Sequence, residues 1–131
     1  MDAKTAKKLK RLGARMVRQW GAGFGKPLCV MAGTPNLWDD EINQHRAKWW
    51  CLAEWRVNGV IVSLSESRVF QRGSEFSAYL SMDELSECSA EADSAHEALR
   101  LVVVAARDAC ANEDVDAGAL EGVSAMIKGV A

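Results

Sequence analysis

Cysteine and histidine are the residues of this chain best suited to nucleophilic catalysis or metal binding, and both are scattered. No two cysteines share a Cys-x-x-Cys spacing, and His45 and His96 lie far apart. A zinc site needs three or four converging ligands, which this spacing does not supply. Cys88 is the best nucleophile because polar residues flank it, but its acidic surroundings should raise its pKa and disfavour the thiolate. The sequence therefore predicts no enzyme, no metal site and no cofactor.

Two other motifs suggest ligands but have ordinary explanations. Residues 21–26, Gly-Ala-Gly-Phe-Gly-Lys, look like a phosphate-binding loop. Such a loop follows a strand and precedes a helix, whereas this one follows a helical pattern and precedes Pro27. We interpret 21–27 as a Gly-rich linker. The acidic residues 39–41 could bind a divalent cation, but adjacent acids on a helix diverge, and acids near a helix start favour its dipole.

The net charge of -2 hides two oppositely charged segments. Residues 1–20 contain seven basic residues and one acidic residue, whereas residues 83–116 contain ten acidic and two basic residues. At ~100° per residue, five of the cations share one side of a helix. These candidate nucleic-acid-binding residues are Lys4, Lys8, Arg11, Arg15 and Arg18. The alternatives are a solvated helix face and a helix docked on residues 83–116.

A second candidate surface combines tryptophans with acidic residues. Strand alternation sends the side chains of Trp49 and Trp50 to opposite faces, one into the core and one outward unless a helix covers it. An exposed tryptophan is a common interface residue. The candidate partner-binding residues are Trp49, Trp50, Glu84, Glu87, Glu91 and Asp93.

Hydrophobic periodicity predicts four helices, over residues ~3–20, ~35–47, ~95–111 and ~117–129. Glycines after Trp20 are expected to stop the first helix. Thr34-Pro35 suits the start of the second. Ser94 and Glu97 form a capping box for the third, and Ser81–Glu84 predicts a further short turn of helix.

The clearest predicted element is a β-hairpin about Asn58-Gly59, the pair that favours a type I′ turn. It pairs Val57 with Val60, Trp55 with Val62, and Ala53 with Leu64. One or two further strands are expected, over Leu28–Met31 and Glu75–Leu80, with a turn at Gly73. The chain, residues 1–131, is thus predicted to be one α+β domain with a small antiparallel sheet packed against helices.

Residues 84–99 resemble the HicB-like antitoxin domain. Asp93-Ser94 and Glu97-Ala98-Leu99 match the Gly-Asp-Thr-x-x-Glu-Ala-Leu motif with which that family opens a helix, and the upstream hairpin matches its small sheet. The resemblance spans about residues 50–110. Glu87 and Ala92 stand where the family favours Gly, and the family's C-terminal DNA-binding segment has no counterpart. The resemblance implies a protein-binding regulator of a toxin or nuclease.

These patterns lead to two expectations of function. The first is a small protein-binding regulator or inhibitor of phage or mobile-element type, blocking a nuclease or host-defence complex. The alternative is a nucleic-acid-binding accessory protein that uses the basic helix 3–20. No apolar region follows the basic N-terminus, and no apolar run approaches the ~20 residues that span a bilayer, so a cytoplasmic protein with four reduced cysteines is expected. The sequence is also compatible with a homodimer.

Overall fold

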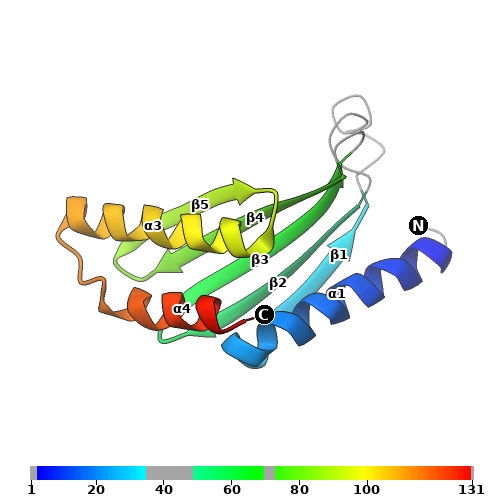
Figure 1. Ribbon diagram of the computed structural model, residues 1–131, viewed down its shortest axis with the longest axis horizontal. Helices are drawn as coiled ribbons and strands as arrows, with labels where there is room; N and C mark the ends of the chain where they lie inside the picture. Colours follow the sequence, from blue (N-terminus) through cyan, green and yellow to red (C-terminus); the bar gives the residue numbers. More distant parts are fainter. Residues whose placement is uncertain (1–2, 35–48, 70–72, 131) are drawn as a thin grey trace.

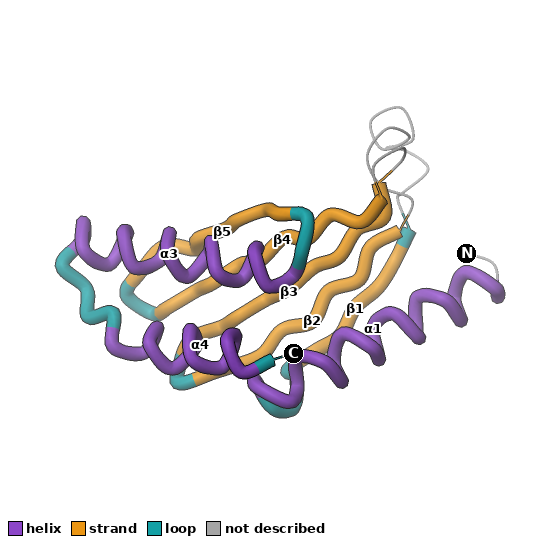
Figure 2. Tube along the Cα trace, in the orientation of Figure 1, coloured by secondary structure: helices purple, strands orange, loops and turns teal. Residues whose placement is uncertain are grey.

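The computed structural model of the protein describes residues 3–34, 49–69 and 73–130. Over these residues, a five-stranded antiparallel sheet is covered on one face by three helices, which confirms the predicted α+β fold (Figures 1 and 2). The elements are α1 (Ala3–Phe24), β1 (Cys29–Gly33), β2 (Trp49–Val57), β3 (Val60–Val69), β4 (Gly73–Met82), β5 (Leu85–Ala92), α3 (Ala95–Glu113) and α4 (Gly118–Gly129). The helix expected over ~35–47 lies outside the described residues.

The sheet is a meander in which each strand pairs with the next along the chain, in the order β1-β2-β3-β4-β5. The hairpin between β2 and β3 turns at Asn58 and Gly59, whose φ angles of 52° and 80° are the positive values a type I′ turn requires. Val57 pairs with Val60, and the register continues without a slip along both strands. The predicted hairpin is therefore confirmed.

One face of this sheet forms the core, because apolar residues alternate with polar ones along the central strands. The inward residues of β2 and β3 are buried: Trp49, Cys51, Ala53, Trp55, Val57, Val60, Val62 and Leu64. α1 packs over β1 and β2, α3 packs over β4 and β5, and α4 packs against α3 (Figure 1). Among the described helices, none is both long and apolar enough to cross a bilayer.

The first helix is longer than expected, since α1 continues past Trp20 to Phe24. The Phe24 ring stacks on Trp20 at a centroid distance of 5.9 Å and lies 5.4 Å from the Trp55 ring. A Cβ at Gly23 would lie 2.9 Å from Val130, so the glycine lets two parts of the chain approach closely. The predicted linker 21–27 is thus wrong over residues 21–24, because aromatic packing outweighs the helix-breaking tendency of glycine.

The predicted turn of helix at Ser81–Glu84 is also wrong. β4 extends to Met82, a two-residue turn follows, and β5 begins at Leu85. The sheet therefore has one strand more than the expected maximum. β5 is an edge strand whose half-buried positions carry small residues, Cys88, Ala90 and Ala92, so its hydrophobic alternation is weak. Pairing with β4 decides its conformation.

The last two helices follow the prediction closely. Ser94 caps α3, because its hydroxyl accepts a hydrogen bond from the backbone N–H of Glu97 at 3.2 Å. α3 ends at Asp114, whose φ of 55° is left-handed. In α4, the residues Leu120, Val123 and Ile127 are buried, as the periodicity predicts.

Candidate functional site

Three helices do not fill the whole inner face of the five strands. On this face, α1 lies over β1 and β2 and α3 lies over β4 and β5, while α4 lies between them near the end that carries the β2–β3 turn (Figure 1). Toward the other end, the gap between α1 and α3 holds a cavity of about 270 Å³. We call it the central cleft, and its lining includes Arg15, Trp20, Glu66, Phe76, Asp93 and His96.

Glu66 brings a carboxylate into this otherwise apolar layer. The inward positions of β3 are apolar through Leu64, and the next inward position is Glu66, which is only 7% exposed. Its carboxylate lies 3.5 Å from Arg15 Nη2 and accepts a hydrogen bond from Ser74 Oγ at 3.2 Å. Charge-assisted hydrogen bonds are usually ~2.5–2.9 Å long, so these two partners compensate the buried charge weakly.

His96 of α3 forms part of one wall of the cleft and contacts two other segments, α1 and the residue after α4. It lies in the first turn of α3, and its ring contacts Trp20 of α1 at a centroid distance of 4.6 Å. Its Nε2 lies 2.7 Å from the carbonyl oxygen of Val130, just after α4. A carbonyl only accepts, so Nε2 donates this hydrogen bond. The imidazole therefore holds α1, α3 and the end of α4 in a common arrangement.

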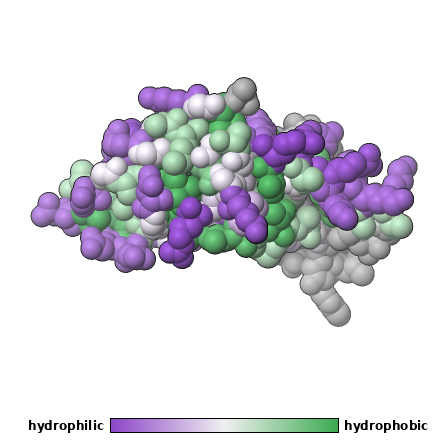
Figure 3. Space-filling model, turned by 90° about the horizontal axis from the view of Figure 1, so that it is seen from below, coloured by the Kyte–Doolittle hydropathy of each residue, from purple (hydrophilic) through white to green (hydrophobic). Residues whose placement is uncertain are grey.

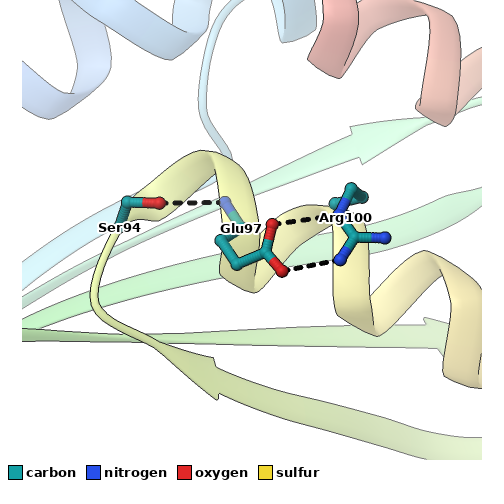
Figure 4. Close-up of polar contacts among 3 residues, drawn as sticks. All are labelled: Ser94, Glu97 and Arg100. Atoms are coloured by element: carbon teal, nitrogen blue, oxygen red, sulfur yellow. Dashed lines mark hydrogen bonds and ion pairs between the residues drawn. The ribbon is translucent and has the colours of Figure 1, made fainter.

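The first turn of α3 does not add a free carboxylate to the cleft. The Glu97 carboxylate pairs with Arg100 through two hydrogen bonds of 2.9 and 2.6 Å, and does not complete the capping box with Ser94 (Figure 4). The hydrogen bonds from Arg100 lower the pKa of Glu97. The acidic groups that line the cleft are thus Glu66 and Asp93.

A second surface runs along β5, which is an edge strand of the sheet. Every charged residue from 83 to 93 is acidic, and each is exposed. We call this surface the acidic edge, and it consists of Asp83, Glu84, Glu87, Glu91 and Asp93. The four acids predicted to bind a partner therefore lie along one edge of the molecule.

The two tryptophans of that predicted set lie elsewhere. Trp49 is in the core, 7% exposed, with Lys8 Nζ 5.8 Å from its ring centroid. Trp50 is half-buried on the opposite face of β2. Its indole ring lies against Gly33, where an added Cβ would come within 2.9 Å of the ring. Two strands, β3 and β4, lie between β2 and β5, so the tryptophans and the acidic edge do not form one site.

The predicted nucleic-acid-binding residues remain at the surface of α1. Lys4, Lys8, Arg11, Arg15 and Arg18 are all exposed. Figure 3, which looks at the molecule from the side of α1 and α4, shows hydrophilic side chains over the end where α1 begins. Arg15 pairs with Glu66. No ion pair between described residues joins α1 to residues 83–116.

The four cysteines are free thiols. Burial raises the pKa of Cys51 to about 11, with a further contribution from the negative charge of Glu66. Burial also raises the pKa of Cys88, with smaller effects of Cys110 and Glu113. In the part of the chain that the structure describes, no three His, Cys, Asp or Glu side chains are grouped so as to hold a metal ion.

Reasoning from the sequence missed Glu66 and the role of His96. The alternation that places Leu64 inward also places Glu66 inward, so this signal was available. The contacts of His96 with Trp20 and Val130 carry no local signal, because they join residues far apart in the chain.

No known protein family matches the chain, and no curated protein or solved structure does so either.

Proposed function

We propose that this chain is a small protein-binding regulator or inhibitor, and that the acidic edge contacts a basic surface of its protein partner. The observation that carries the proposal is the run of five exposed acids in residues 83–93, on the edge strand β5 and in the turns at its two ends, with no basic residue between them.

The position of these acids favours a role in recognition. An edge strand exposes unpaired backbone groups, and charged side chains on it discourage pairing with other strands. At ~3.4 Å per residue, the eight residues of β5 are about 27 Å long, and exposed acids lie along the strand and at both of its ends. Such a surface attracts a basic partner over a distance and accelerates association. A nucleic-acid-binding cleft, as in a nuclease or a host-defence complex, offers this kind of basic surface.

A pair of matched double variants tests this surface. Glu87→Lys with Glu91→Lys reverses the charge of the edge, and Asp108→Lys with Glu113→Lys makes the same change on the exposed side of α3. We expect a protein retained from lysate by immobilised wild type to be retained by the α3 variant and lost by the edge variant. Equal retention by both variants, measured by quantitative mass spectrometry, would exclude the acidic edge as the binding surface.

A second candidate function is nucleic-acid binding by α1. Lys4, Arg11 and Arg18 are exposed and belong to none of the ion pairs found between described residues. If they contact phosphates, affinity for a random duplex should fall steeply with salt, because each contact releases counterions. Reversal of these three residues to Glu should then abolish binding. Sub-micromolar wild-type affinity at physiological salt would favour this function over protein binding.

A further inference from the structure

We propose that the central cleft binds a primary ammonium group on a short aliphatic stem, with Glu66 as its counter-ion. This site shares Asp93 with the acidic edge, but it opens between α1 and α3 over the inner face of the sheet, and its counter-ion Glu66 does not belong to that edge.

The charge of the cleft favours a cation. The Glu66 carboxylate is more than nine-tenths buried, and its two partners among the described residues are at 3.5 and 3.2 Å. Asp93 adds a second carboxylate to the lining. An ammonium group is a compact charge with three N–H donors, and it can supply the short hydrogen bonds that Glu66 lacks. A calcium ion would need six or more oxygen ligands, which two carboxylates do not provide.

The remaining lining favours an aliphatic stem next to the charge. Met16, Leu64 and Phe76 supply apolar contacts, and the half-buried Phe76 supplies an aromatic ring. Trp20 also lines the cleft, but it is only 1% exposed, and its ring packs against Phe24 and His96. Aromatic rings attract cations held close to their faces and also pack against methylene groups. A volume of about 270 Å³ is near the lower limit of ligand pockets, which span ~300–1,000 Å³. The cleft therefore suits a small amine or a lysine side chain better than a nucleotide.

The Arg15 guanidinium would compete with an ammonium ligand for the Glu66 carboxylate. Its side chain is 60% exposed, and its guanidinium lies 3.5 Å from the Glu66 carboxylate, a longer separation than in a close ion pair. An incoming ammonium replaces a solvated cation that is held loosely. Removal of the Arg15 charge should therefore strengthen the binding of an amine, whereas it would weaken the binding of a carboxylate or a zwitterion.

The test is an NMR titration of the ¹⁵N-labelled full chain with three probes. n-Pentylamine represents a free amine, Nα-acetyl-lysine methylamide represents a lysine side chain, and n-pentanol is the neutral control. We expect the amine probes to shift the backbone amides of Ala95 and His96 and the indole N–H of Trp20, and the alcohol to leave them unchanged. If n-pentylamine binds and the lysine derivative does not, the ligand is a free amine. If both probes bind, a lysine side chain also fits the cleft.

Three single variants then test the assignment of charge. Glu66→Gln should weaken amine binding about tenfold or more, because it removes the counter-ion. Glu91→Gln, at an exposed position of β5, should leave it within about twofold. Arg15→Gln should strengthen amine binding. Because Arg15 is exposed, this variant should fold, and it keeps the proposal testable if Glu66→Gln fails to fold. Weaker amine binding by Arg15→Gln, unchanged binding by a folded Glu66→Gln, or equal shifts from n-pentanol would each overturn the proposal.

The double variant Glu87→Lys with Glu91→Lys separates this inference from the proposed function. It should lose the protein partner but keep amine binding in the cleft. Loss of amine binding together with the partner would show that the amine is held by the acidic edge and would overturn the assignment to the cleft.

Discussion

Cys51 and Glu66 face each other across β2 and β3, and the charge of Glu66 affects the chemistry of Cys51. Burial raises the pKa of Cys51 from its ordinary value of 9.0 to about 11, and the neighbouring Glu66 charge adds to the shift. Because the thiolate is the reactive form, a rise of about two pKa units lowers its population roughly 100-fold near neutral pH. Cys51 is therefore a packed thiol and a poor nucleophile.

This shift predicts how the cysteines react with iodoacetamide. In the native protein we expect the half-buried Cys29 to be alkylated first, and Cys51 at least about 100-fold more slowly than in denaturant. The rate at Cys51 should rise with pH up to about 11, since only then does its thiolate predominate. Timed alkylation followed by peptide mass spectrometry measures each site. Rapid alkylation of native Cys51 at neutral pH would contradict its burial.

At the scale of elements, the β2–β3 hairpin depends on the backbone conformation of its turn. Gly59 has a φ of 80°, and a Cβ added there would meet no atom within 4 Å. Gly59→Val should therefore lower the free energy of unfolding by about 1 kcal/mol or more through backbone strain alone. Asn58→Gly keeps a pair that suits the turn and is the control. Urea denaturation measures both, and equal stabilities of Gly59→Val and wild type would refute the turn type.

The extension of α1 to Phe24 gives a second prediction at this scale. Gly21 lies inside the helix with no atom within 4 Å of an added Cβ, whereas a Cβ at Gly23 would lie 2.9 Å from Val130 and 3.1 Å from the Met126 carbonyl oxygen. Gly21→Ala should raise the free energy of unfolding by about 0.5–1 kcal/mol, because alanine favours the helix. Gly23→Ala should lower it. Identical effects in thermal unfolding would indicate that residues 21–24 are not a packed helical turn.

At the scale of the whole molecule, the basic helix α1 and the acidic edge lie near opposite edges of the sheet. α1 packs on β1 and β2, and the acidic edge is on β5. Four strand spacings of ~4.8 Å put about 19 Å between β1 and β5. The two strands are therefore farther apart than the screening length of ~8–10 Å at physiological ionic strength. The charged segments approach each other where Arg15 and Asp93 line the central cleft, but Arg15 pairs there with Glu66, so the attraction between the segments contributes little to stability.

Reversal of Lys4, Arg11 and Arg18 to Glu should therefore leave the melting temperature nearly unchanged. These residues avoid Lys8, which contacts Trp49, and Arg15, which pairs with Glu66. Differential scanning calorimetry at low and high salt checks the expectation. A wild type that loses several degrees with added salt, while the reversed variant does not, would show that α1 is held by the acidic segment after all.

The sequence by itself determined the features that depend on neighbouring residues. Asn58-Gly59 and the alternation on either side of it specify the register of the hairpin, and Ser94 specifies where α3 begins, because turn and cap chemistry act over a few residues. The basic segment 1–20 and the acidic segment 83–116 were also evident from the sequence, because they depend only on composition.

Tertiary structure alone decided where α1 ends, that residues 85–92 form a strand, and that a cleft exists. Phe24 continues the helix because Trp20 and Trp55 bury it, and β5 forms because β4 offers it a hydrogen-bonding edge. The cleft joins Arg15, Glu66 and His96 from three separate elements. Local preferences at these positions are weaker than the packing and pairing made available by distant parts of the chain, so the contacts that decide them appear only when the chain is folded.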